Sequence, residues 1–225
     1  MCTRTESGIH VVTQHDPESI TVAPAPPKGT LNGARWHEIL DAAGEVFQEK
    51  GYQAARIEDI ANRVGILKGS LYYYIETKED LLYALSVAGH STGLATLDED
   101  DATRAADAPA RIGAFIERWM ATIPSTPQYA RVTERDVRLL TDQRRAAVME
   151  MRNQMHQYVR KIVEQGIAEG HFDPTTDPGV ATNSIFELLN STSRWFRPTG
   201  RLSHDALGAF YKKLIVQGLR PEATS

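Results

Sequence analysis

Apolar residues recur with a helical period along most of this 225-residue chain, and no segment alternates as a β-strand would. The first apolar stripe begins at Arg35 and stops before Gly51, a residue that readily ends a helix. The clearest stripe runs from Ile112 to Ile123, where apolar side chains stand at i, i+3, i+4, i+7, i+8 and i+11. The pattern therefore predicts an all-α protein.

Nine helices are expected from this periodicity. They span residues 35–50, 56–64, 67–75, 77–97, 109–123, 128–141, 142–170, 178–196 and 203–219. Gly65 can adopt the positive φ of a tight turn between the second and third, and Thr77 with Asp80 predicts a capping box at the fourth. We expect a proline-rich disordered arm over residues 1–30, a helix-turn-helix DNA-binding domain over 31–82, and a ligand-binding and dimerisation domain over 83–225.

Composition excludes some classes of protein but does not by itself indicate a function. No apolar run approaches the roughly eighteen residues that span a bilayer, so we expect no membrane segment. Cys2 is the only cysteine, and the polar start lacks the apolar core of a secretory signal, which favours a cytoplasmic protein. The net charge is −4, and residues 31–80 hold six Lys or Arg against nine Asp or Glu, a balance of −3. DNA binding therefore depends on where those six cations lie.

Three runs within the first ninety residues share one register. They read GYQAARIEDIA at 51–61, GILKGSLYYYI at 65–75 and KEDLL at 78–82. Together they closely resemble the signature of the TetR/AcrR family of transcriptional repressors. The resemblance implies a homodimer that binds a palindromic double-stranded DNA operator and is released by a small molecule. It also implies a carboxy-terminal ligand chamber and a four-helix dimer interface built from the last two helices.

Within this motif the turn at Gly65 would direct the start of the third helix into a major groove. Lys68 and Ser70 could reach base edges there, and Gly69 would let the backbone approach closely. Tyr73 is expected to offer its hydroxyl to a phosphate or its ring to a thymine methyl, while Tyr72 is partly a packing residue. The predicted DNA-binding residues are Arg56, Lys68, Gly69, Ser70, Tyr72, Tyr73 and Lys78.

Two of these positions carry particular expectations. Lys78 begins the fourth helix, where its ammonium and the nearby amides could grip one phosphate. The family usually offers Ser or Thr at the start of the second helix, but this chain has Ala55 and Arg56. Either Arg56 takes over the phosphate contact, or it is an exposed arginine without a partner.

The carboxy-terminal half carries a second resemblance. The runs QGIAEGHF at 165–172 and RWFRP at 194–198 look like those of TetR-type repressors of fatty-acid and sterol breakdown, which respond to acyl-CoA thioesters. The effector is therefore expected to be small and apolar, with a CoA thioester as one class, although Phe186 and Asn190 replace an arginine and a tryptophan of the sterol-type relatives.

The chamber and the dimer interface are predicted from apolar side chains at helical spacing, each of which could equally be plain core. The candidate ligand residues are Phe115, Trp119, Met120, Tyr129, Met151, Met155, Tyr158, Phe186, Leu189 and Asn190. The candidate interface residues are Trp195, Phe196, Leu207, Phe210, Tyr211 and Leu214. Three arginines, Arg131, Arg135 and Arg138, could either meet a CoA phosphate or form a solvated face.

The alternative function is a serine hydrolase. Residues 89–93 read GHSTG, which matches the nucleophile elbow Gly-x-Ser-x-Gly, and His204 could follow as the base. The elbow needs a preceding strand and a parallel sheet, whereas the segment before Gly89 continues a helix, so no enzyme is predicted. The seven histidines show no metal-ligand spacing, and neither a metal nor a cofactor is expected.

Overall fold

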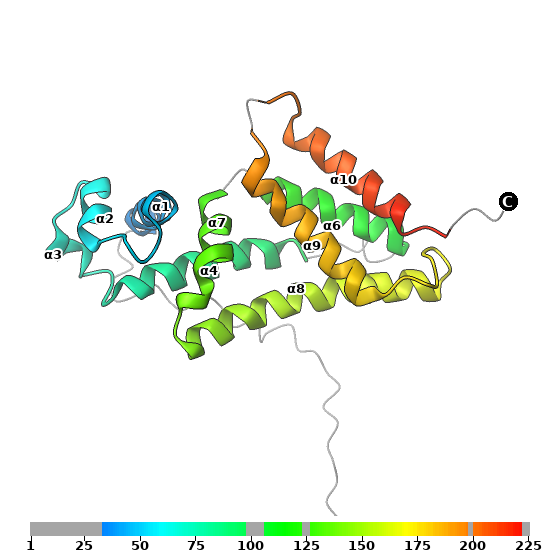
Figure 1. The fold of residues 1–225 in the computed structure, drawn as a ribbon, viewed down its shortest axis with the longest axis horizontal. Coiled ribbons are helices and arrows are strands. Elements are labelled where there is room, and N and C mark those ends of the chain that lie inside the picture. Colours follow the sequence, from blue (N-terminus) through cyan, green and yellow to red (C-terminus); the bar gives the residue numbers. More distant parts are fainter. Residues whose placement is uncertain (1–32, 98–105, 123–126, 198–199, 222–225) are drawn as a thin grey trace, which may run out of the picture.

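The computed structural model describes residues 33–97, 106–122, 127–197 and 200–221. The predicted arm over residues 1–30 lies outside these ranges. Every regular element among the described residues is helical, as the periodicity predicted. Figure 1 shows α1, α2 and α3 gathered at one end of the molecule and α10 near the other, with the long helices α4 and α8 running between the two ends.

The helix boundaries follow the predicted ranges closely. They are α1 Gly33–Lys50, α2 Ile57–Val64, α3 Lys68–Leu71, α4 Lys78–Ala95, α6 Ala108–Thr122, α7 Pro127–Asp136, the 3-10 helix η2 Val137–Leu139, α8 Asp142–Ala168, α9 Pro178–Trp195 and α10 His204–Gly218. Gly65 ends α2 with a φ of 76°, as predicted for the turn. The Asp80 carboxylate accepts the backbone N–H of Thr77 at 2.8 Å, which completes the predicted cap of α4.

Two predicted helices are shorter than expected. The third ends at Leu71 rather than at Ile75, because the amides of Tyr73 and Tyr74 bond to carbonyls three residues back and the backbone tightens into turns. The helix predicted over 128–141 ends at Asp136 and continues only as η2. In both cases the last predicted turn is present as a tighter, non-α conformation.

Two hydrophobic cores hold the helices together. The first, which we call the N-terminal core, joins α1 to α4 and also takes in Tyr129 and Val132 of α7 and Val148 of α8. The second, the C-terminal core, is built by α6, α8, α9 and α10 around Phe115, Phe172 and other buried side chains. Since α7 and α8 contribute to the N-terminal core, the helix-turn-helix unit does not pack independently of the rest.

Polar contacts reinforce the connection between the N-terminal helices and the rest. The Tyr129 hydroxyl of α7 donates to Asp41 of α1 at 2.8 Å. Arg135, also on α7, donates to the carbonyl oxygen of Phe47 at 2.7 Å. The helices of the described residues include none that is long and apolar enough to cross a bilayer.

Candidate functional site

One side of α3 packs into the protein core, and the other side is exposed to solvent. Leu71 and Ile75 are fully buried in the N-terminal core. On the opposite side Leu67 is 80% exposed, and Lys68 and Ser70 are also exposed. A Cβ placed on Gly69 would meet no atom within 4 Å, so nothing in the chain blocks a close approach there. This is the geometry of a helix presented to a groove.

The tyrosine triplet divides differently from the prediction. Tyr73 is 60% exposed, as expected, but Tyr72 is also 47% exposed rather than packed. Only Tyr74 is a packing residue, because its ring stacks on Trp36 of α1 with the ring centres 6.5 Å apart. Tyr72 directly follows α3 in a helical conformation, and its amide donates to the carbonyl oxygen of Lys68, so its side chain lies about 100° around the helix axis from the buried Leu71. Two exposed aromatic rings therefore follow the end of α3.

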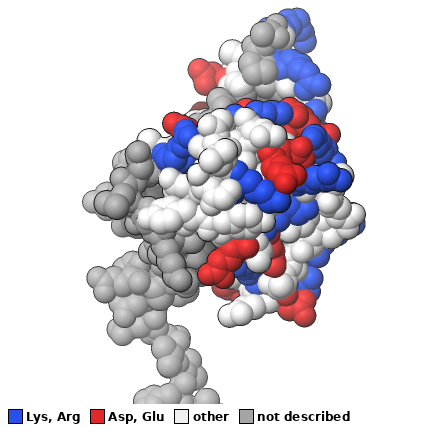
Figure 2. Space-filling model, turned by 90° about the vertical axis from the view of Figure 1, so that its left-hand side faces the viewer, with Lys and Arg blue, Asp and Glu red and all other residues white. Residues whose placement is uncertain are grey.

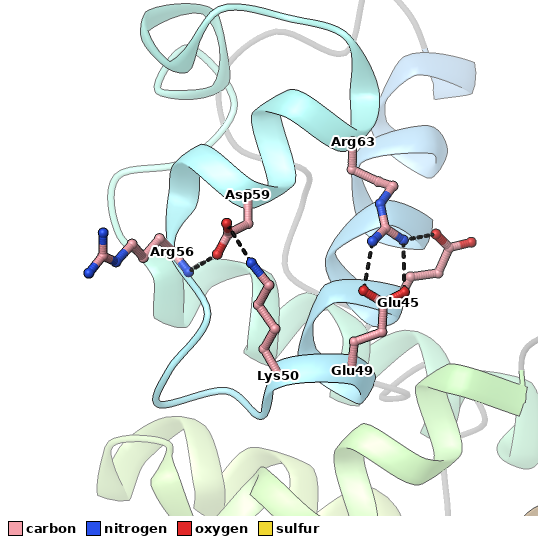
Figure 3. A network of polar contacts seen from close by, with 6 residues as sticks. All are labelled: Glu45, Glu49, Lys50, Arg56, Asp59 and Arg63. Atoms are coloured by element: carbon pink, nitrogen blue, oxygen red, sulfur yellow. Dashed lines mark hydrogen bonds and ion pairs between the residues drawn. The ribbon is translucent and has the colours of Figure 1, made fainter.

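Arg56 is free to meet a phosphate. Its backbone N–H donates to the Asp59 carboxylate at 2.9 Å, and Asp59 is also paired with Lys50 at 2.7 Å. These contacts lower the pKa of Asp59, first through the Lys50 hydrogen bond and then through the Arg56 amide. The Arg56 guanidinium itself extends away from this network, as Figure 3 shows, and has no hydrogen bond or ion pair with the described residues.

The other cations near α3 are already paired. Arg63 forms ion pairs with Glu45 and Glu49 of α1, both at 2.7 Å, and these hydrogen bonds raise its pKa. Lys68 is paired with Glu58 of α2 at 2.8 Å, which lowers the pKa of Glu58. Carboxylates of α1 and α2 therefore already neutralise Arg63 and Lys68, two of the six cations on which DNA binding was expected to depend. Figure 2 agrees, because acidic and basic side chains lie side by side on this end of the molecule.

Lys78 has a different environment from the one expected. Its ammonium donates to the carbonyl oxygens of Tyr52 at 2.7 Å, Gln53 at 3.2 Å and Ala55 at 2.8 Å. It also lies 4.5 Å from the centre of the Tyr52 ring, and partial burial lowers its pKa. All three N–H donors thus point into the protein. In this conformation Lys78 fastens the start of α4 to the segment before α2, and the phosphate contact stays a prediction.

A chamber of about 200 Å³ lies between α4, α6, α7, α8 and α9, and η2 also contributes to its lining. Its lining residues are Gly89, His90, Trp119, Ala130, Thr133, Glu134, Val137, Met149, Arg152, Met155, His156, Phe186, Glu187, Asn190 and Ser193. Four of the predicted ligand residues, Trp119, Met155, Phe186 and Asn190, are among them. The other six predicted residues do not line this chamber.

Those six belong to the cores instead. Phe115, Met120 and Leu189 are buried in the C-terminal core, and Tyr158 is partly buried against it. Tyr129 lies in the N-terminal core, and Met151 packs against that core. A helical stripe marks a side chain as inward-facing, but it does not say whether a neighbour or a cavity meets it.

The chamber wall also holds polar side chains that were not among the predicted ligand residues. His90, Thr133, Arg152 and His156 all line it. Burial lowers the pKa of both histidines, and the nearby Arg152 lowers them further. One sequence signal could have identified two of them. Arg152 and His156 are four residues apart in a predicted helix, so they lie on the same face as Met149.

The three arginines of α7 and η2 do not line this chamber. Arg131 donates to the carbonyl oxygen of Ser193 at 2.6 Å. Arg135 donates to Asp136 and to the carbonyl oxygen of Phe47. Arg138 is an exposed residue of η2 and is also absent from the lining.

The six predicted interface residues divide evenly between the surface and the C-terminal core. Trp195, Phe210 and Leu214 are 50%, 57% and 49% exposed, so they are available to a second chain. The other three, Phe196, Leu207 and Tyr211, are buried in the C-terminal core of their own chain. Leu207 and Tyr211 lie on the buried side of α10, which packs on α6, and Phe196 directly follows α9.

The hydrolase motif has no catalytic setting. Residues 89–93 lie inside α4, which spans Lys78–Ala95, and no strand precedes them among the described residues. The strained turn that exposes a nucleophile in the elbow is therefore missing.

Two family models match the chain. The model for bacterial regulatory proteins of the tetR family matches residues 39–85. The model for the tetracyclin repressor-like C-terminal domain matches residues 105–219, about half of the chain. These families and the relatives below are transcriptional regulators rather than enzymes, as predicted.

Curated relatives span nearly the whole chain. The HTH-type transcriptional repressor KstR2 of Mycobacterium tuberculosis is 28% identical over 195 residues, covering 86% of this chain and 96% of the relative. The fatty acid metabolism regulator protein of Bacillus subtilis is 25% identical over 186 residues, covering 82% and 95%. Both agree with the predicted likeness to repressors of catabolism.

Solved structures share the fold. A tetR-family regulatory protein from Rhodococcus RHA1 is 28% identical, with a TM-score of 0.76, and covers 85% of this chain and 100% of its own. AibR, described in complex with isovaleryl coenzyme A and operator DNA, superimposes with a TM-score of 0.69 at 22% identity and covers 83% and 98%. By its sequence and by its all-helical architecture, the chain belongs to the TetR family of bacterial transcriptional regulators.

Proposed function

We propose that this chain is a ligand-responsive repressor that binds a palindromic operator in the cytoplasm as a homodimer and is released when a small, largely apolar effector enters the chamber. The single observation that carries the proposal is the surface around α3, where Leu67 before the helix and Tyr73 after it are exposed although Leu71 between them is fully buried. An exposed leucine and tyrosine would contact thymine methyl groups, and the unpaired Arg56 would contact phosphate.

Dimerisation would use the exposed apolar side chains of α9 and α10. Three large apolar side chains are about half exposed there: Trp195, Phe210 and Leu214. Val180 near the start of α9 is 65% exposed and adds to them. A two-fold interface formed by these helices would pair two α3 helices, as reading a palindrome requires.

Release would depend on α4 and α8, which join the chamber to the DNA-binding helices. Gly89 and His90 of α4 line the chamber, and the same helix begins at Lys78 beside α2. The start of α8 is tied to the start of α4, because Arg144 pairs with Asp80. A guest that moves α4 or α8 would therefore shift α3, provided that it binds the shifted form more tightly.

The relatives suggest the class of effector. AibR is described with isovaleryl coenzyme A, and KstR2 as a ketosteroid transcriptional regulator. A CoA thioester is therefore one candidate here. Drug-sized ligands occupy pockets of about 300–1,000 Å³, so a chamber of about 200 Å³ would hold the apolar part of such a molecule and leave the nucleotide outside.

The test uses a duplex that the wild-type protein selects from a random pool. Arg56→Ala is expected to weaken binding to this duplex several-fold and to reduce the slope of log affinity against log salt by about one, because one phosphate contact is lost. Fluorescence anisotropy at several salt concentrations measures both quantities. The matched control is Arg160→Ala, since Arg160 lies on α8 and pairs with Glu164. The proposal would be contradicted if the wild-type protein selected no particular sequence from the pool. It would also be contradicted if Arg56→Ala left the slope of log affinity against log salt unchanged.

Glu58→Gln is expected to increase affinity for the selected duplex by about threefold to tenfold. The substitution frees Lys68 from an exposed and therefore weak ion pair, and it removes a negative charge next to the phosphates. The same anisotropy titration measures the change. In a Lys68→Ala background the gain should shrink, and an equal gain there would show that Lys68 is not the group released.

A further inference from the structure

The chamber contains a buried hydroxyl that the protein leaves unpaired. Thr133 of α7 lines the chamber and is only 6% exposed. Its Oγ1 has no hydrogen-bond partner among the described residues. Burying a hydroxyl without a partner is costly, and such groups in native proteins call for an explanation. The neighbouring wall leaves room at this atom, because a Cβ placed on Gly89 of α4 would lie 3.9 Å from it.

A second polar group of complementary kind lines the same chamber. Nδ1 of His90 lies 2.8 Å from the carbonyl oxygen of Ser86, which can only accept a hydrogen bond. Nδ1 therefore carries the proton, and Nε2 of the neutral ring is an acceptor. Burial lowers the pKa of His90, which favours this neutral form. The hydroxyl of Thr133 can donate, and the ring of His90 can accept.

The charged residues of the lining are the more accessible ones. Arg152, Glu134 and Glu187 are all exposed. Glu134 is already paired with Arg194. The less exposed part of the wall is aromatic, since the buried Phe186 contacts the partly buried Trp119 and stacks on the ring of His156 with the ring centres 4.2 Å apart. The charged groups of the lining are therefore on its exposed residues, whereas the neutral hydrogen-bonding groups of Thr133 and His90 are on buried or partly buried ones.

We propose that the chamber selects a compact, uncharged aromatic or alicyclic alcohol, whose hydroxyl accepts a hydrogen bond from Thr133 and donates one to His90. A hydroxyl satisfies both groups at once, whereas a hydrocarbon satisfies neither and a carboxylate offers no proton to His90. The ring of the guest packs on Trp119 and Phe186. This inference rests on the proposed effector chamber and adds the chemistry of the effector's buried end.

Three probes of one shape test it by isothermal titration calorimetry: 1-indanol, indane and indane-1-carboxylate. The wild-type protein is expected to bind 1-indanol on the order of tenfold more tightly than indane, because only the alcohol satisfies the buried groups. Equal affinity for the two, no binding of 1-indanol, or tighter binding of the carboxylate would each overturn the proposal. Tighter binding of the carboxylate would indicate that Arg152, rather than Thr133 and His90, recognises the ligand.

Variants of Thr133 distinguish the effect of its hydroxyl group from the effect of its side-chain shape. Thr133→Val is expected to abolish the preference for 1-indanol over indane, while Thr133→Ser should keep it. The matched control is Thr182→Val, because Thr182 is equally buried but donates to Pro178 at 2.7 Å and does not line the chamber. An unchanged preference in Thr133→Val would overturn the proposal. Gly89→Ala should weaken binding of 1-indanol, since the added methyl would occupy the space beside Thr133.

Failure of this inference and failure of the proposed function give different results. Thr133-dependent binding of 1-indanol with no change in affinity for the selected duplex would support the site and contradict its coupling to DNA. Release of DNA by a ligand that does not depend on Thr133 would support the repressor function and contradict the hydroxyl site.

Discussion

Replacing both Phe210 and Leu214 with glutamate is expected to convert the protein to a monomer and to lower its affinity for the selected duplex by about 100-fold or more. Both side chains are roughly half exposed on α10, where charge would prevent apolar contact with a second copy. A monomer can bind only one half-site. It therefore lacks the increase in overall affinity that a dimer obtains by binding two half-sites at once. Sedimentation analysis gives the mass, and anisotropy gives the affinity.

The control for this double variant is Ala168→Glu, which places one added glutamate on an exposed residue at the end of α8 rather than on α10. It should remain dimeric and bind DNA as the wild type does. A dimer that persists in Phe210→Glu/Leu214→Glu would show that another surface forms the interface. A monomer that still binds with wild-type affinity would contradict the need for two copies.

Lys78→Met is expected to lower the free energy of unfolding by about 2 kcal/mol, because hydrogen bonds from a charged donor to three carbonyl oxygens are lost. Methionine keeps most of the side chain's apolar stem. The start of α4 would then be less firmly held beside α2, and affinity for the selected duplex should fall by about tenfold as α3 loses its orientation. Urea unfolding and anisotropy measure the two effects.

The salt dependence of binding decides how Lys78 acts. A positioning residue should leave the slope of log affinity against log salt nearly unchanged, whereas loss of a phosphate contact should reduce it by about one. The control is Lys161→Met, on an exposed position of α8. An unfolding free energy equal to that of the wild type would contradict the structural role inferred from the three carbonyl contacts.

Most of the fold could be predicted because it depends on local sequence. The stripe from Ile112 to Ile123 gave a helix that starts and ends within one residue of the expected range. Gly65 and Thr77 likewise marked a turn and a cap correctly, since each depends on the backbone of its immediate neighbours.

The site was harder to predict because it depends on contacts between helices. Nothing local distinguishes Arg56, which is free, from Arg63, which is held by two carboxylates of α1. Phe196 and Phe210 both lie on apolar stripes, but only Phe210 points away from the chain's own core. Thr133 gave no sequence signal at all, because its significance comes from being buried without a partner.

The central claim is that two copies of α3 lie in major grooves related by a two-fold axis. Protection of guanine N7 from dimethyl sulfate on the selected duplex tests it directly, since N7 is exposed in the major groove. The account predicts two symmetric groups of protected guanines, with centres about 10 base pairs apart or a multiple of that spacing. Protection within a single groove, or none at guanine N7, would contradict it.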